Sequence, residues 1–458
     1  MVNQIFEKRS EMPVSAEELF AWHLRTGAFE RLGAPWEPPA TTLRSGSVRD
    51  GGEHVFRVPF GPIQLRWVAH YSDCIEGRQF RDTQAQGPFA FWQHTHRFEP
   101  AGEGRSTLVD HIEYRLPLGL VGQWVMGGRI RGMLERISRY RHAVTGDDLK
   151  FNAAHRSAPM HVVISGASGL VGTALTAALT GAGHRVSSLS RAPADPMQHR
   201  LHWDPEKKDL DKACFNGVDA VVHLAGDNIG AGRWSAAKKK KMRDSRILGT
   251  MLISDTLAKL QRAPGVLVSA TAVGIYGDRG DEELTEESAP GSDYLAGLCQ
   301  EWEQAVEPAV QKGIRVVLPR FGVILSPRGG ALRKMLTPFK MGVGGRIGSG
   351  RQYLSWITLD DAVAAIQHLI HTSTLKGPVN VVAPTPVTNL EFTKTLGKVL
   401  HRPTILPMPA FMVKLLFGEM GKALLLSSQK VKPAVLAQSG FQFRHPTLEE
   451  GLRHVLGR

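Results

Sequence analysis

HVVISGASGLVGTALTAALTGAGHRVSSLSR, residues 161–191, is the stretch that decides the fold of most of this 458-residue chain. A short β-branched run at 162–164 is followed by Gly166, Gly169 and Gly172, then by small residues, then by a second strand-like run at 185–189. This order predicts a strand, a tight turn, a helix packed closely on a sheet, and a parallel strand. Because a helix N-terminus with no Cβ in the way attracts phosphate, the pattern indicates a dinucleotide site.

The end of the second strand indicates which dinucleotide. An NAD site would place a carboxylate there to accept hydrogen bonds from the ribose, about 20 residues after the glycines. This chain has Ser190 and Arg191 instead. An arginine beside a hydroxyl suits a 2′-phosphate, so we expect NADP(H). The alternative is that Arg191 is a solvated loop residue and that the site accepts either cofactor.

Composition places the chain among soluble globular proteins, with 42% hydrophobic and 22% charged residues. No apolar run approaches the ~18 residues of a membrane-spanning helix, and charges interrupt the N-terminal segment where a signal peptide needs an apolar core. The three scattered cysteines suggest reduced thiols. We therefore expect a cytoplasmic protein without membrane insertion.

The net charge of +13 raises the alternative of nucleic-acid binding, for which the sharpest cluster is Lys238, Lys239, Lys240 and Lys241. No aromatic residues interleave these lysines, and no base-reading motif accompanies them. A solvated helix face is the favoured interpretation, so no nucleic-acid partner is expected. Excess positive charge also attracts anionic nucleotides.

The chain divides into two regions of different pattern. Residues 1–150 show strand-like segments between turns, with helical segments at 16–26 and 121–141, which suggests an antiparallel sheet and a long helix. A stretch without periodicity predicts a linker at 151–159. From 160 onward, strands alternate with helices, which is typical of an α/β parallel sheet. The strands expected there are 162–165, 185–189, 219–224, 266–271, 314–319 and 379–382.

Further motifs include VVHLAGDNI at 221–229, DSRILGT at 244–250, VSATAVGIYG at 268–277, LPRFGVILSPRGG at 318–330 and GSGRQYLSWITLDD at 348–361. With the glycine turn, they make residues 160–458 resemble the epimerase-like group of the extended short-chain dehydrogenase/reductases, also described as sugar-nucleotide epimerase or cell-division-inhibitor-like. The resemblance implies a Rossmann-type doubly wound sheet, and residues 384–458 are similar to the C-terminal module of that group.

The resemblance also implies roles for individual residues. Residues His223 to Gly226 would pass beside the ribose and nicotinamide of the cofactor, and Arg320 with Trp356 to Asp361 would shape the substrate pocket. The structural alternatives are that Gly226 is only a turn and that Asp360 and Asp361 only cap a helix. The cofactor would be bound by Gly166, Ser168, Gly169, Leu170, Val171, Gly172, Ser190, Arg191, Leu224, Ala225, Gly226 and Arg246.

Residues 1–150 resemble the α+β helix-grip fold of START-like and polyketide-cyclase-like domains, which encloses a cavity for an apolar ligand. Phe89, Phe91 and Trp92 could line that cavity, but strand aromatics are more often core. His94 and His96 share one face of a strand. With Asp110 and His111 they could be read as metal ligands, but the spacing favours paired polar positions, so no metal is expected.

The residues expected for catalysis depart from the pattern of related dehydrogenases, whereas the cofactor motif follows it. Related dehydrogenases use a tyrosine whose pKa is lowered by a lysine four residues later, because a phenol with a pKa near ~10 is otherwise a poor base. Here Tyr294 is followed by Leu298 at the lysine position. Thr271 is the expected hydroxyl partner of the reacting oxygen, and Tyr276 is a further phenol nearby.

Because Leu298 stands where related dehydrogenases have a lysine, two functions stay open. The favoured one is an NADP(H)-dependent oxidoreductase or epimerase-like enzyme acting on a small-molecule carbonyl or sugar-nucleotide-like substrate, with Thr271 and Tyr294 as catalytic candidates. The alternative is a catalytically silent NADP(H)-binding regulator or scaffold whose N-terminal domain holds an apolar ligand. Neither the substrate nor the oligomeric state has a recognisable signature.

Overall fold

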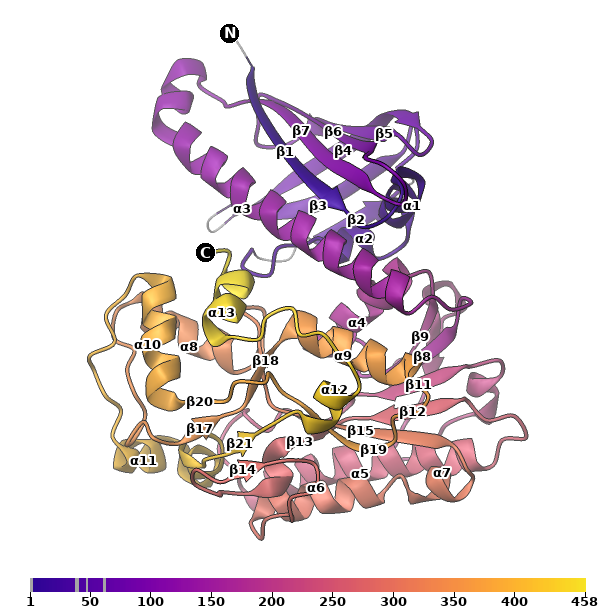
Figure 1. The fold of residues 1–458 in the computed structure, drawn as a ribbon, viewed down its shortest axis with the longest axis vertical. Coiled ribbons are helices and arrows are strands. Elements are labelled where there is room, and N and C mark those ends of the chain that lie inside the picture. The colour runs from indigo at the N-terminus through magenta and orange to yellow at the C-terminus, as the bar shows by residue number, and fades with distance from the viewer. Residues whose placement is uncertain (1–2, 38–40, 47, 61–62) are drawn as a thin grey trace. The chain divides into compact units, whose positions relative to one another are not determined.

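The computed structural model describes residues 3–37, 41–46, 48–60 and 63–458. The chain forms two compact units, one made essentially of Met1–Arg156 and the other of Ser157–Leu179 and His184–Leu456. The first contains an antiparallel sheet with a long helix, and the second contains a parallel sheet with helices on both faces (Figure 1).

The N-terminal unit is a seven-stranded antiparallel sheet in the order β1-β7-β6-β5-β4-β3-β2. Two short helices separate β1 from β2, and one 36-residue helix follows β7 and contacts β1 and β7. The strands are β1 (Gln4–Met12), β2 (Thr41–Ser45), β3 (Glu53–Phe60), β4 (Ile63–Ile75), β5 (Gln79–Gln86), β6 (Phe91–Pro100) and β7 (Ser106–Arg115), and the helices are α1 (Ala16–Leu24), α2 (Ala28–Arg31) and α3 (Gly119–Ala154).

Helix α3 corrects the predicted linker. It continues to Ala154 rather than ending near 141, so the first residues of the predicted linker 151–159 are helical. The helix continues because polar residues of its last turns are buried with partners. The carboxylate of Asp148 accepts hydrogen bonds from Nε of Arg31 at 2.7 Å and from Nη2 of Arg31 at 3.0 Å. Both side chains are more than nine-tenths buried. Leu149 packs beside them in the core.

The C-terminal unit has an eight-stranded parallel sheet, in which β10-β9-β8-β11-β12-β15-β13 are neighbours in that order and β19 pairs with β15. Helices α4 and α9 cover one face, and α5, α6 and α7 cover the other (Figure 1). The sheet strands are β8 (His161–Ser165), β9 (Arg185–Ser190), β10 (Arg200–His202), β11 (Ala220–His223), β12 (Val266–Ser269), β13 (Thr271–Ala272), β15 (Arg315–Phe321) and β19 (Gly377–Val381).

This doubly wound parallel sheet confirms the fold expected for the C-terminal region, and each of the predicted strands is present. The three-residue strand β10 was not predicted.

The remaining strands are β14 (Glu283–Leu284), β16 (Val323–Leu325), β17 (Tyr353–Leu354), β18 (Trp356–Thr358), β20 (Val387–Thr388) and β21 (Lys430–Val431). The helices are α4 (Leu170–Gly181), α5 (Ala236–Ala258), α6 (Tyr294–Gln304), α7 (Glu307–Gln311), α8 (Gly330–Lys340), α9 (Leu359–His371), α10 (Asn389–Leu400), α11 (Ala410–Gly421), α12 (Ala434–Gln438) and α13 (Leu448–Leu456). Single turns of helix are η1 (Pro196–Gln198), η2 (Lys212–Phe215), η3 (Val273–Tyr276) and η4 (Lys422–Leu426).

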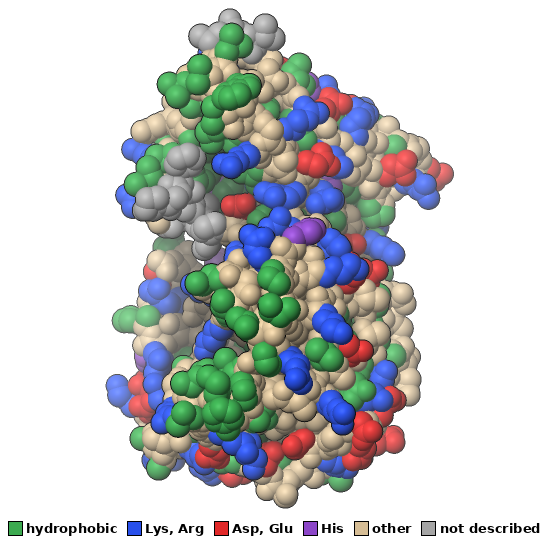
Figure 2. All heavy atoms as spheres, turned by 90° about the vertical axis from the view of Figure 1, so that its left-hand side faces the viewer, with side chains coloured by type: hydrophobic (Ala, Val, Ile, Leu, Met, Phe, Trp, Pro, Cys, Tyr) green, Lys and Arg blue, Asp and Glu red, His purple; other side chains and the backbone are tan. Residues whose placement is uncertain are grey.

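The lysine run on α5 is paired with carboxylates. Lys238 and Lys241 contact Asp227, Lys239 contacts Glu419, and Lys240 contacts Asp244. On the face shown in Figure 2, lysine and arginine side chains are distributed over both units with carboxylates among them. Among the described helices, none is long and apolar enough to cross a membrane. The three cysteines are free thiols.

We predict that residues 1–156, expressed alone, unfold in one cooperative thermal transition. Fragment 1–141 should not, because it lacks Asp148 and leaves Arg31 as a buried, uncompensated charge, at a typical cost of about 3–5 kcal/mol. Circular dichroism melts of the two fragments test this. Within fragment 1–156, Asp148→Ala should reproduce most of the loss, whereas Lys150→Ala, at an exposed position of the same helix, should not. Equal melting temperatures for both fragments would contradict the prediction.

Candidate functional site

The turn between β8 and α4 is built so closely that it admits no Cβ at two of its glycines. Gly166 has φ +73°, and a Cβ on it would lie 2.8 Å from the backbone nitrogen of Ala225. A Cβ on Gly172 would lie 2.2 Å from the carbonyl oxygen of Gly166. The backbone N–H of Gly169 donates to that same oxygen at 3.0 Å. The turn is therefore a glycine cradle at the start of α4, the arrangement that admits a pyrophosphate.

The cradle faces the end of β11. Leu224 donates its backbone N–H to Ser165 at 3.1 Å, and Gly226 lies against Arg246, whose Cζ would be 3.4 Å from a Cβ there. Arg246 donates from Nη2 to the Asp227 carbonyl at 3.0 Å. The structure thus brings Leu224, Gly226 and Arg246 to the edge of the sheet that carries the cradle. Ala225 belongs to the same group, and Ser168, Leu170 and Val171 form the turn and the start of α4.

The end of β9 carries Ser190 and the exposed Arg191. Ser190 Oγ accepts the backbone N–H of Ala192, and Arg191 makes no side-chain hydrogen bond or ion pair within the described part of the chain. The next carboxylate, Asp195, is committed to its own turn, where it accepts the N–H groups of Met197 and Gln198. This corner therefore offers a guanidinium and a hydroxyl to an anion and no competing free carboxylate.

Thr271 lies where β12 passes into β13. Thr271 is buried. The backbone N–H of the preceding Ala270 donates to the backbone carbonyl oxygen of His223 at 2.9 Å, which joins this position to the end of β11. The Thr271 hydroxyl is buried, lies near the thiol of Cys299 and makes no hydrogen bond of good geometry within the described part of the chain. Burial raises the pKa of Cys299 to about 12, an effect that Arg246 and the Thr271 hydroxyl only reduce. The thiol is therefore neutral at neutral pH, and Thr271 and Ser269 both offer buried hydroxyls at this edge that have no partner among the described residues.

Tyr294 is the first residue of α6, and its hydroxyl donates to the Lys239 carbonyl at 3.0 Å. Burial raises its pKa, although the nearby Arg246 lowers it somewhat. The ammonium of Lys239 lies over the ring, 4.7 Å from its centre, rather than at the hydroxyl. Leu298, at the position of the usual lysine, is buried in the core. Tyr294 is consequently a protonated phenol without an activating cation at its oxygen.

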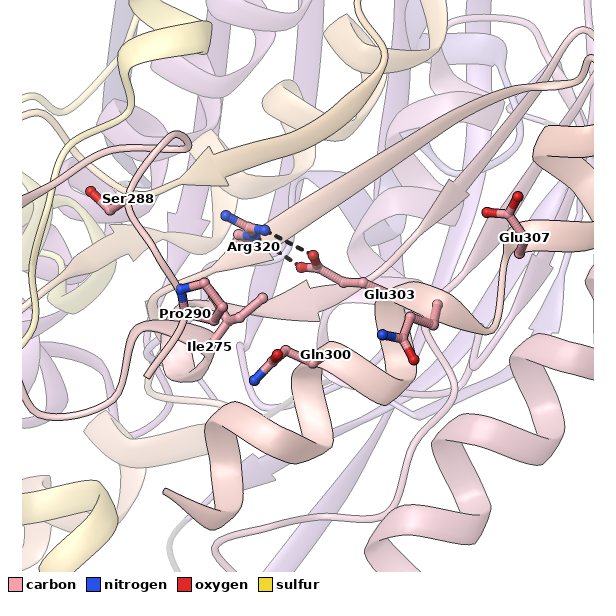
Figure 3. A pocket seen from close by; sticks show the side chains of 8 residues that line it. Ile275, Ser288, Pro290, Gln300, Glu303, Glu307 and Arg320 are labelled. Carbon is pink, nitrogen blue, oxygen red and sulfur yellow. Dashed lines mark hydrogen bonds and ion pairs between the residues drawn. The ribbon is translucent and has the colours of Figure 1, made fainter. Parts of the chain in front are cut away.

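Arg320 lines a pocket of about 310 Å³ together with Ile275, Glu303 and Gln300 (Figure 3). Glu303 accepts from Nε and Nη2 of Arg320 at 2.9 and 2.8 Å, and Tyr276 Oη accepts from Nη1 at 2.9 Å. Burial would lower the pKa of Arg320, but Glu303 raises it, so the guanidinium stays charged. Glu303 was not predicted, because no sequence spacing relates α6 to β15.

Trp356 corrects a prediction. It was expected to shape the substrate pocket, but its side chain is completely buried and its indole N–H donates to the Thr385 carbonyl at 3.0 Å. It packs in a core cluster with Phe392 and Leu452. With its polar atom satisfied and its ring enclosed, Trp356 packs in the core and has no exposed surface to offer a substrate.

Comparisons with known proteins agree with this geometry. Residues 162–382 match the NAD dependent epimerase/dehydratase family, and residues 408–455 match a domain of unknown function, DUF1731. Epimerase family protein Mb2239 of Mycobacterium bovis is 47% identical over 298 residues, which are 65% of this chain and 98% of that protein.

Two solved structures extend the comparison. A nucleoside-diphosphate sugar epimerase from Corynebacterium glutamicum is 32% identical with a TM-score of 0.81, and the match covers 99% of this chain and 90% of that one. Human epimerase family protein SDR39U1 with NADPH is 34% identical with a TM-score of 0.60, over 65% of this chain and 99% of that one. The glycine cradle, the sheet around it and these relatives together show that the chain belongs to the NAD(P)-binding epimerase family.

Proposed function

We propose that this chain is an NADP(H)-dependent oxidoreductase or epimerase-like enzyme that acts on a carbonyl or sugar-nucleotide-like small molecule. The observation that carries the proposal is the glycine cradle of Gly166 and Gly172 beside a strand end that presents Ser190 and Arg191 and no free carboxylate. The structure of human SDR39U1 with NADPH supports the choice of cofactor.

The cofactor's fit rests on space and charge. A Cβ at Gly172 would overlap the backbone of Gly166 and Ala167, so a glycine there lets the N-terminus of α4 begin close to the turn, where its free N–H groups can face a pyrophosphate. The exposed guanidinium of Arg191 would pair with a 2′-phosphate. When bound, NADP(H) would supply the hydride donor or acceptor of the reaction.

The chain's own part in the chemistry is to hold an oxygen and move a proton. Thr271 is a buried hydroxyl beside the end of β11, placed to donate a hydrogen bond to the oxygen of the reacting carbon. Tyr294 holds its proton toward Lys239 and has a raised pKa, so it is a weak candidate for the base. We therefore assign the oxygen contact to Thr271 and the proton to a water molecule that this hydroxyl orients.

We also propose that the N-terminal unit is a START-like helix-grip domain. Its support is the order of the elements: two helices after β1, a sheet in which β1 pairs with β7, and the helix α3 that follows and contacts both strands. The aromatic residues Phe89 and Trp92 pack with Trp67 and Tyr114 in the core of this unit.

The first prediction tests the cradle. Gly172→Ala should destabilise the protein by about 1–3 kcal/mol and weaken NADPH binding at least about tenfold, because the new methyl group overlaps backbone atoms. Gly297→Ala is the matched control, since it is also a helical glycine but has nothing within 4 Å of the added Cβ. It should be neutral or stabilising by up to ~1 kcal/mol. Thermal melts and fluorescence titration with NADPH measure both effects; unchanged binding in Gly172→Ala would count against the site.

The second prediction concerns cofactor choice. The wild-type protein should bind NADPH more tightly than NADH, and Arg191→Ala should lose about 1.5–3 kcal/mol of NADPH affinity, roughly 10- to 100-fold, with little change for NADH. Arg185→Ala, at the opposite end of β9, is the control and should change neither affinity. Isothermal titration with both cofactors decides the matter, and equal affinities in the wild type would refute the NADP(H) assignment.

The third prediction separates the two hydroxyls. Thr271→Val should slow single-turnover hydride transfer about 100-fold, because the reacting oxygen loses a hydrogen bond, whereas Tyr294→Phe should slow it less than about tenfold. Both variants should keep wild-type NADPH affinity. Nicotinamide absorbance, followed with a carbonyl compound identified by screening, measures the rate. A collapse in Tyr294→Phe alone would restore the tyrosine mechanism, and no transfer with any carbonyl tested would oppose the enzyme assignment.

A further inference from the structure

The inner face of the N-terminal sheet carries a polar cluster between two apolar ones. Strand β6 turns Trp92, His94, His96 and Phe98 toward the same face. Trp92 belongs to one buried apolar cluster and Phe98 to another, so the two histidines lie between them. Placing ionisable groups there is costly unless they are paired or bind a ligand.

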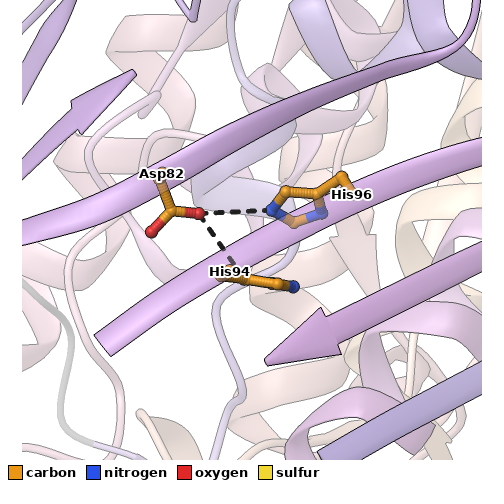
Figure 4. Close-up of side chains that lie close together, drawn as sticks. All are labelled: Asp82, His94 and His96. Carbon is orange, nitrogen blue, oxygen red and sulfur yellow. Dashed lines mark ion pairs between the residues drawn. The ribbon is translucent and has the colours of Figure 1, made fainter. Parts of the chain in front are cut away.

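Asp82, on the neighbouring strand β5, completes a triangle of donor atoms with these histidines (Figure 4). Its Oδ2 atom is 3.5 Å from Nδ1 of His94 and 3.5 Å from Nε2 of His96. All three atoms lie within 4.8 Å of one another. In a tetrahedral zinc site with ligands ~2.0–2.2 Å from the metal, two ligand atoms are roughly 3.3–3.6 Å apart. The measured separations match the edges of such a site and exceed an ordinary hydrogen bond.

A second carboxylate backs the two imidazoles on their other side. Asp110 Oδ1 is 3.2 Å from His94 Nε2 and 2.9 Å from His96 Nδ1, and all three residues are buried or nearly so. Asp110 Oδ2 is 3.1 Å from His142 Nε2, and His142 Nδ1 is 2.8 Å from Ser10 Oγ. A carboxylate behind metal-ligating histidines is the usual outer-shell arrangement, since it fixes which ring nitrogen carries hydrogen.

Two buried or nearly buried carboxylates face the two imidazoles, so the cluster needs a positive charge. Without a metal ion, a proton on His96 supplies that charge, because burial lowers the pKa of this ring but Asp110 and Asp82 raise it to about 9. With a metal ion, both rings are neutral, turn an N–H toward Asp110, and present His94 Nδ1 and His96 Nε2 to the ion beside Asp82. The contacts to Asp110 are not in line, because His94 Nε2, His96 Nδ1 and Asp110 Oδ1 make no hydrogen bond of good geometry among the described residues. These three buried atoms therefore lack well-directed hydrogen bonds within the cluster.

We propose that Asp82, His94 and His96 bind a divalent transition-metal ion of the zinc class, with Asp110 as a positioning residue for both histidines. Two imidazole ligands and one carboxylate suit zinc, iron or cobalt, whereas magnesium and calcium prefer oxygen ligands only. Strand pairing adds Asp82 of β5 to the paired polar positions expected on β6 and places it beside the two histidines. The site lies in the N-terminal unit and does not depend on the proposed function.

The test uses the full chain, freed of metal with a chelator and then titrated with Co²⁺ or Zn²⁺. The wild-type protein should bind one equivalent at micromolar concentration, with visible Co²⁺ absorption of a tetrahedral site, and its melting temperature should rise with Zn²⁺ and not with Mg²⁺. Asp82→Asn and His94→Gln should abolish this binding. Asp110→Asn should weaken it about 10- to 100-fold.

His111→Gln is the matched control, because His111 also contacts two carboxylates, Glu7 and Glu113, but lies nearer the surface of the same sheet. It should keep the full equivalent of metal. Circular dichroism of the metal-free variants checks that they are folded. Absence of stoichiometric Co²⁺ or Zn²⁺ binding in the wild-type protein would overturn the proposal and leave the cluster as an ion-pair network, as would loss of binding in His111→Gln with retention in Asp82→Asn.

Discussion

The close approach of two backbone segments governs the C-terminal unit. The turn after β8 can lie against the end of β11 only because Gly166 has no side chain, and α4 can begin this close to the turn only because Gly172 has none. That contact brings the carboxyl ends of β8, β11 and β12 to one edge, and with them the cradle, Arg246 and Thr271. A substitution at the turn would therefore alter cofactor space and sheet packing together. The proposed cofactor site depends on this small volume.

The acid–base chemistry is arranged differently from that of dehydrogenases with a tyrosine–lysine pair. Two cations approach Tyr294, but Lys239 lies over the ring and Arg246 is held by carbonyl oxygens, so neither acts on the phenolic oxygen as a lysine at position 298 would. Burial is consequently the largest effect, and it raises the pKa of Tyr294. Near Thr271, burial also keeps Cys299 protonated. Tyr294 and Cys299 therefore stay protonated at this edge, whereas burial lowers the pKa of His223, at the end of β11, to about 4 and leaves its imidazole neutral.

The sequence indicated those features that depend on local pattern. Parallel strands such as β8 and β11 are buried on both faces, so they appear as continuous β-branched runs, and the glycine spacing defines the turn between β8 and α4. Strand β1 was missed because charged residues occupy its alternate, exposed positions. Features that depend on tertiary contacts could not be predicted from the sequence either. Asp148 of α3 is paired with Arg31, which is distant in sequence, and Trp356 is enclosed by helices distant in sequence. Asp82 likewise joins His94 and His96 only through strand pairing.

The pairing of β1 with β7 has a consequence for synthesis on the ribosome. Residue Gln4 is opposite Tyr114, so the first strand made must wait for the last strand of its sheet before it gains a partner. Helix α3, which packs on both, is made later still. Such non-local closure slows folding, because the loop entropy must be lost before the contacts form. A nascent chain would thus expose the apolar side of β1, including Phe6 and Met12, through most of the translation of this domain.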